Sequence, residues 1–172
     1  MATRSSYFTE IQFSGFAYTT IDQILNHAGR LRHRTQGRLA CPLVLRAPCG
    51  AGIHPPEHHS ESPEAYFAHT PGLRVISPSN PNDAYWMIQQ AIDSDDPVMF
   101  FEPKRRYWQK GQVNLDAPSL SMHKAATVRP GTDLTMVAYG PMVATALPCV
   151  TIRQAIWRAQ TARAPLCAQS GS

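Results

Sequence analysis

The sequence contains no apolar run that approaches the roughly 18–20 residues needed for a membrane-spanning helix. No apolar stretch follows Arg4 near the initial methionine, so the pattern of a secretory signal is missing. Cysteine is sparse: the four cysteines are scattered and none forms a C-x-x-C pair. This spacing argues against a zinc site and a disulfide framework, and it favours a reducing compartment. We therefore expect a cytoplasmic protein that does not enter a membrane.

Charge of either sign is also scarce. Charged residues account for 16% of the chain and hydrophobic residues for 43%, a balance typical of a globular domain with a sizeable core. Two short basic clusters stand out: Arg30, Arg32, Arg34 and Arg38, and then Lys104, Arg105, Arg106 and Lys110. Such clusters are usually solvated faces or anion contacts, and no aromatic residue interleaves with the first. We expect no nucleic-acid partner, and a basic anion-binding or nucleic-acid-binding module stays a minor alternative.

Strand-like and helix-like segments alternate along the first hundred residues. We expect strands at residues 10–13, 42–45, 73–76 and 98–101, and helices that begin at Thr20, Ser62 and Asn80. The strands are nearly continuous apolar runs, which is typical of a mostly parallel sheet with helices on both faces. The predicted fold class is therefore α/β. Ligands bind in the loops that follow such strands, here residues 14–19, 47–60 and 102–110.

The pattern weakens after residue 111. A polar connector at residues 116–121 is followed by expected strands at 123–129 and 134–138 and a short stretch that ends near Leu147. The tail at residues 148–172 has weak periodicity and no core-like strand, so we expect it to be poorly ordered or to form a helix without a partner.

The densest group of chemically active side chains is a histidine-rich loop. His58 and His59 are adjacent, so their side chains point apart, and the two prolines after His54 prevent a helix that would join it to His58. We therefore predict no metal site. Two interpretations stay open: a solvent-exposed cluster, or a histidine held by the helix at Ser62 and poised to transfer protons near neutral pH.

Four segments occur in the order and spacing of a known family: Glu10–Phe13, Asp22–Ile24, Glu57–His69 and Phe100–Trp108. Together they resemble the transketolase-like pyrimidine-binding domain of the β subunit of bacterial branched-chain 2-oxo acid dehydrogenases. The pyruvate dehydrogenase β subunit is the near relative, and the last segment is more similar to the branched-chain branch. The resemblance covers residues 10–147, an incomplete domain flanked by atypical segments at 1–9 and 148–172.

The resemblance implies a thiamine diphosphate site that is shared with an α subunit, which would hold the diphosphate through magnesium. Phe16 matches the aromatic position beside the aminopyrimidine ring of this cofactor, and a half-buried loop aromatic is the alternative. His59 matches the family's catalytic histidine, which faces the reacting carbon and the incoming lipoyl group, where protons move. Asp22 and Gln23 are expected to support the fold.

The resemblance also implies an activity and its partners. Intact relatives decarboxylate branched-chain 2-oxo acids oxidatively and transfer the acyl group to lipoyl, as heterotetramers with the α subunit and bound to a lipoyl transacylase core. Some relatives bind potassium at residues 91–96. This chain has Ala91, Ser94 and Asp96 there, so we do not expect an ion.

The chain departs from the family pattern in three places. The family's glutamate that hydrogen-bonds the pyrimidine ring is upstream of Glu10, and the nine residues before Glu10 resemble nothing in the family. His54 and the following prolines replace small residues, and the segment after Leu147 reads like translation in an unrelated frame. We therefore expect the isolated chain to be inactive, and a non-catalytic remnant is the main alternative to a working subunit fragment.

Overall fold

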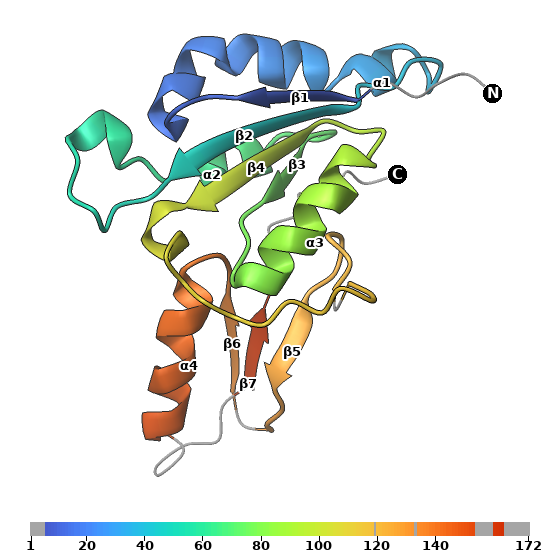
Figure 1. The fold of residues 1–172 in the computed structure, drawn as a ribbon. Coiled ribbons are helices and arrows are strands. Elements are labelled where there is room, and N and C mark those ends of the chain that lie inside the picture. The colour runs from blue at the N-terminus through green and yellow to red at the C-terminus, as the bar shows by residue number, and fades with distance from the viewer. Residues whose placement is uncertain (1–5, 119, 133, 154–159, 164–172) are drawn as a thin grey trace.

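A four-stranded parallel sheet forms the centre of the computed structural model, which describes residues 6–118, 120–132, 134–153 and 160–163 (Figure 1). Across the sheet the strands run in the order β1 (Tyr7–Glu10), β2 (Leu43–Cys49), β4 (Val98–Pro103) and β3 (Arg74–Ile76). All three pairings are parallel, and Val44 on β2 lies opposite Phe8 on β1 and Val98 on β4. The predicted α/β class is confirmed.

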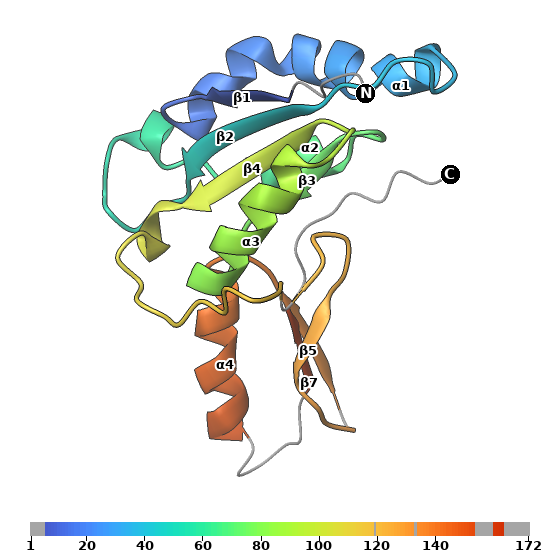
Figure 2. The same ribbon diagram turned by 45° about the vertical axis from the view of Figure 1, so that its right-hand side comes forward.

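Helices cover both faces of this sheet. One face carries η1 (Ser14–Thr20), η2 (Gln23–Ala28) and α2 (Glu64–Ala68), and the other carries α3 (Pro81–Ile92). Figure 2 shows α3 in front of the sheet. The short helix α1 (Leu31–Arg34) follows η2. This two-sided cover explains why the central strands β2 and β4 are apolar on both sides.

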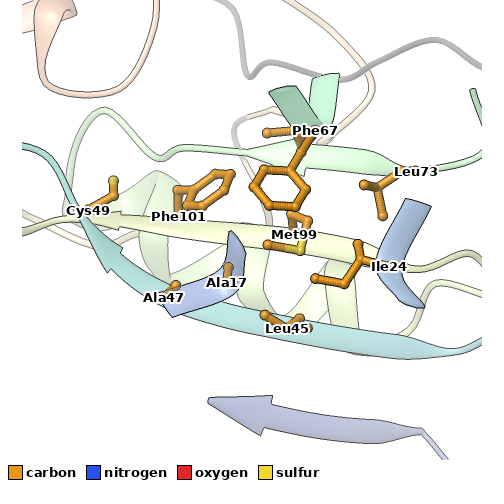
Figure 3. Close-up of a cluster of buried hydrophobic side chains, with 10 residues drawn as sticks. Ala17, Ile24, Leu45, Ala47, Cys49, Phe67, Leu73, Met99 and Phe101 are labelled. Carbon is orange, nitrogen blue, oxygen red and sulfur yellow. The ribbon is translucent and has the colours of Figure 1, made fainter. Parts of the chain in front are cut away.

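Each covered face has its own buried core. On the first face Phe67 of α2 packs against Phe101, with ring centroids 5.6 Å apart (Figure 3). The other members of this cluster come from η1, η2, the sheet and the residue before β3: Ala17, Ile24, Leu45, Ala47, Cys49, Leu73, Val75 and Met99. The second face is built from Val44, Ile76, Met87, Ala91, Val98, Phe100 and Met122.

Local sequence signals explain where α3 begins. The Asn80 side chain accepts a hydrogen bond from the backbone N–H of Asp83 at 2.9 Å, which caps the first turn. Pro81 occupies the first helical position, where its missing N–H costs nothing. The expected helix start at Asn80 is thus confirmed.

Several predicted boundaries are wrong. Residues 14–19 are not a loop, because they form the 3₁₀-helix η1, and the expected single helix from Thr20 is divided between η1, the π-helical η2 and α1. In η2 the N–H of Gly29 reaches back to the carbonyl of Ile24 at 2.9 Å. Strand β2 continues to Cys49 because its pairing with β4 extends through Pro103.

A second, three-stranded sheet contains β5 (Ala126–Arg129), β7 (Gln160–Arg163) and β6 (Thr135–Ala138), in that order. Helix α4 runs from Met142 to Arg153, past Pro148. Strand β7 lies within the tail at residues 148–172 and pairs with both neighbouring strands. Residues 154–159 and 164–172 lie outside the described part, so their poor order stays a prediction. No helix of the described residues could span a membrane.

Candidate functional site

Three segments that follow strands meet at the carboxyl-terminal edge of the parallel sheet. Helix η1 follows β1, the short 3₁₀-helix η3 (Glu57–His59) lies in the loop after β2, and a second one, η4 (Lys104–Arg106), follows β4. Because the four strands are parallel, these segments gather at one edge, as the sequence predicted. The candidate residues Phe16 and His59 both lie there.

Two phenylalanines and two histidines form what we call the aromatic–histidine cluster: Phe13, Phe16, His58 and His59. His59 packs against both phenyl rings, with ring centroids 4.3 Å from Phe13 and 5.6 Å from Phe16. Its neighbour His58 lies 5.1 Å from the Phe16 ring. His59 is half-buried, whereas His58 is exposed and the Phe16 ring is 40% exposed. The cluster therefore presents an accessible aromatic ring beside a sheltered imidazole.

The backbone around the cluster is held together at Glu61. Its carbonyl accepts hydrogen bonds from the N–H of Gly50 at 2.7 Å and from the buried Ser14 hydroxyl at 3.2 Å. Its carboxylate accepts a hydrogen bond from the Tyr18 hydroxyl at 3.2 Å. Burial together with this carboxylate raises the pKa of Tyr18 to about 12, so the phenol stays protonated as the donor. Glu61 thus ties η1 to the histidine loop.

Lys104 contacts the aromatic–histidine cluster at the ring of Phe13. Its side chain is only 3% exposed, and its Nζ is 5.0 Å from the centroid of the Phe13 ring. Neither this Nζ nor Nδ1 of His59 has a hydrogen-bond partner among the described residues, although both atoms are buried. Burial lowers the pKa of the Lys104 ammonium. The sequence allowed two interpretations of this basic cluster, a solvated loop or a contact with a subunit or an anionic ligand. For Lys104 the first is wrong, because the residue is buried.

A cavity of about 370 Å³ lies beyond the ends of β2 and β4. It is lined by Cys49, Gly50, Ala51, Gly52, Ser62, Glu64, Pro103, Arg105, Tyr139, Pro141 and Met142. Inside it the buried Glu64 carboxylate accepts a weak hydrogen bond from the Cys49 thiol at 3.8 Å. Burial raises the pKa of both groups, so this thiol is not an activated nucleophile. This pair was missed because Cys49 lies outside every segment of the family resemblance and Glu64, although it lies within Glu57–His69, had no assigned role.

Other candidate positions do not join the site. The exposed Asp22 carboxylate accepts a hydrogen bond from Asn26 at 2.6 Å at the start of η2. Its hydrogen-bond partners are Gln23 and Asn26, which do not belong to the aromatic–histidine cluster. Asp96, expected near a possible potassium site, instead pairs with Arg32 at 2.7 Å and Arg74 at 2.9 Å. Burial alone would raise the pKa of Asp96, but these two guanidinium groups lower it overall. The described residues contain no group of three metal-ligating side chains.

The known proteins that are similar to this chain agree with one another. Residues 1–109 match the family model described as the transketolase pyrimidine binding domain. The chain is 52% identical over 143 residues to the pyruvate dehydrogenase E1 component subunit beta of Leifsonia xyli subsp. xyli, covering 83% of this chain and 42% of that protein. It is 48% identical over 138 residues to the 3-methyl-2-oxobutanoate dehydrogenase subunit beta of Mycobacterium tuberculosis, covering 80% and 40%. The chain thus spans about two fifths of the length of these relatives.

Solved structures show the same fold at low sequence identity. A split-gene transketolase, described as an inactive beta4 tetramer, superposes with a TM-score of 0.67 at 18% identity, over 91% of this chain and 48% of that chain. The transketolase of Campylobacter jejuni also gives a TM-score of 0.67, at 13% identity, over 93% and 24% of the two chains. These matches support the architecture independently of close sequence similarity.

Proposed function

The chain belongs to the transketolase pyrimidine-binding domain family, and from this premise we propose that it forms the aminopyrimidine side of a thiamine diphosphate site in a 2-oxo acid dehydrogenase β subunit. The observation that carries the proposal is the contact between Phe16 and His59 at the carboxyl-terminal edge of the sheet. Two residues separated by more than forty positions meet there, where α/β sheets bind ligands.

The side chains present fit the pyrimidine half of this cofactor. The Phe16 ring is partly open to solvent, so an aromatic heterocycle can pack against it without displacing the core. The buried Nδ1 of His59 has no partner among the described residues, which leaves it free for a bound group. When bound, thiamine diphosphate supplies the nucleophilic carbon and the electron sink for 2-oxo acid decarboxylation.

His59 is the residue of this chain that we assign to proton transfer. Its ring is fixed on two sides by Phe13 and Phe16, so its orientation is set before any ligand arrives. Imidazole exchanges protons near neutral pH, as decarboxylation and acyl transfer to a lipoyl group both require. His58 is exposed and contacts Phe16 alone within the cluster, so we assign it no proton-transfer role.

The finer parts of the proposal concern substrate and partners. Relatives named as pyruvate dehydrogenases and as branched-chain dehydrogenases both match the chain. We favour branched-chain 2-oxo acids, because the segment Phe100–Trp108 is more similar to that branch. We also propose a partner α subunit that holds the diphosphate through magnesium, and a lipoyl transacylase core to which the assembly binds. The scattered cysteines favour a cytoplasmic location.

The test is to measure thiamine diphosphate binding to a branched-chain α subunit with magnesium, with and without this chain. If the chain supplies the pyrimidine side, its addition tightens binding, and Phe16→Ala removes most of the gain. Carbon dioxide release from 3-methyl-2-oxobutanoate and from pyruvate then compares the two substrates. No change in cofactor affinity on adding the chain would contradict the proposal and favour a non-catalytic remnant.

A further inference from the structure

Lys104 is the most deeply buried member of its basic cluster, and its ammonium is turned inward. Arg105 and Lys110 are exposed, whereas Lys104 is 3% exposed and its Nζ lacks a hydrogen-bond partner among the described residues. Lysine usually keeps its charged end in water even when its methylene stem is buried. A buried ammonium without a partner destabilises a fold, so packing alone does not account for a lysine at this position.

The ammonium meets one aromatic ring, that of Phe13. Its Nζ is 5.0 Å from the ring centroid, within the range of a cation–π interaction. Phe13 links β1 to η1 in an extended conformation (φ −142°, ψ 146°), and no side-chain hydrogen bond caps η1 there. The contact with Lys104 directly restrains the orientation of the Phe13 ring.

The same ring contacts His59. The two ring centroids are 4.3 Å apart with an interplanar angle of 61°, closer than the contact between His59 and Phe16. A change in the tilt of the Phe13 ring would therefore move the imidazole. Lys104, Phe13 and His59 form a continuous chain of contacts from the end of β4 to the candidate proton-transfer group.

We propose that Lys104 is a positioning residue for His59 and that it acts through the ring of Phe13. The inference rests on the proposed function only where it concerns turnover. The geometric part, that the charge of Lys104 sets the orientation of the His59 ring, can be tested in the chain itself.

The experiment compares Lys104→Met, Lys104→Arg and the exposed control Lys110→Met with the wild-type chain. Methionine keeps a long flexible side chain but removes the charge, and arginine keeps a cation. Proton NMR follows the ring resonances of His59, identified by their loss in His59→Ala. Urea unfolding reports stability, and kcat and KM are measured for the same substitutions in a full-length β subunit assembled with the α subunit.

We expect Lys104→Met to shift the His59 ring resonances. Without the ammonium the Phe13 ring can change its tilt, and its ring-current effect on the His59 chemical shifts then changes. Lys104→Arg should restore them largely, and Lys110→Met should leave them unchanged. The urea midpoint of Lys104→Met should equal or exceed that of the wild type, since an unpaired buried charge is gone. In the assembled enzyme kcat should fall about tenfold in Lys104→Met with little change in KM, the scale that a partly desolvated cation–π contact allows.

Unchanged His59 resonances in Lys104→Met would overturn the inference. So would resonance shifts of equal size in the methionine and arginine variants together with a lowered urea midpoint, because that result describes a structural lysine. A wild-type assembly without turnover counts against the proposed function, and the NMR and unfolding measurements then decide the role of Lys104 independently.

Discussion

Gly15 lies directly against the backbone carbonyl of His58, and a Cβ atom at residue 15 would overlap that oxygen. No left-handed backbone angle explains this glycine, since its φ lies outside the positive range. What excludes a side chain is the close approach of η1 to η3. This approach places Phe16 next to the two histidines. The aromatic–histidine cluster therefore requires a glycine at residue 15.

The first prediction concerns this contact. Gly15→Ala should push η3 away from η1 and lower the free energy of unfolding by about 1–3 kcal/mol, the usual cost of overpacking. A matched control is Gly37→Ala, at a glycine with φ +78° and no atom near the added Cβ. The control should lose about 1 kcal/mol from backbone strain but leave the His59 ring resonances unaltered. Equal unfolding midpoints for Gly15→Ala and wild type would show that the two helices are not in contact.

The second prediction separates the adjacent histidines. In a restored full-length subunit His59→Ala should lower kcat by about 10²–10⁴-fold, the range for loss of a general acid or base. His58→Ala should cost far less, because His58 is exposed and does not contact Phe13. Steady-state measurement of kcat for both variants shows which histidine transfers protons. Similar losses in the two would indicate a general role of the loop rather than proton transfer by one imidazole.

The third prediction concerns pH and His123. The Nδ1 of His123 lies 2.8 Å from a guanidinium nitrogen of Arg74, which can only donate, so the imidazole must accept and be neutral. Burial and then the Arg74 charge lower the pKa of His123, and the carboxylate of Asp96 opposes them in part. The unfolded chain therefore binds more protons at this position than the folded chain. The stabilisation is complete above the ordinary histidine pKa near 6.5 and is lost as pH falls below it.

Urea unfolding between pH 5 and pH 8 measures this effect. The free energy of unfolding should decrease on the acid side of neutrality, and His123→Asn should flatten the decrease, because an amide oxygen can accept from Arg74 without titrating. An unaltered slope in His123→Asn would assign the pH dependence to other groups.

The fourth prediction concerns the cap of α3. Asn80→Ala removes the acceptor for the Asp83 N–H and should cost about 1 kcal/mol of stability. Asn80→Ser should retain most of it, since a hydroxyl can also cap. Comparing the urea midpoints of the alanine and serine variants separates the effect of the cap on stability from the effect of side-chain volume. Serine and alanine variants of equal stability would mean that the first turn of α3 is held by its packing alone.

Much of the parallel sheet was predictable because its signals are local. The apolar run at residues 73–76 overlaps β3, and the Asn80–Pro81 pair marks the start of α3. The meeting of Phe16 with His59 followed from a family resemblance together with the rule that loops after parallel strands share an edge. These predictions needed short-range patterns, the family resemblance and one architectural rule.

The missed features depend on tertiary contacts. Helix η1 forms in a segment that resembled a loop, because Ser14 and Ala17 are buried against the sheet and the histidine loop. Pro48 suggests the end of a strand, yet β2 continues because β4 pairs alongside it. The burial of Lys104 could not be predicted from a run of basic residues, because its ammonium packs against Phe13, which is 91 positions away in the sequence.

Strand β1 lies at the outer edge of the parallel sheet, and all four of its residues are exposed. Among the described residues its outer side has no strand partner, and Tyr7 and Phe8 expose aromatic rings that are 66% and 48% accessible. An edge of this kind is a template on which a strand of another molecule can be added. We therefore expect self-association through β1 at high protein concentration, and a dilution series distinguishes it from assembly with the α subunit.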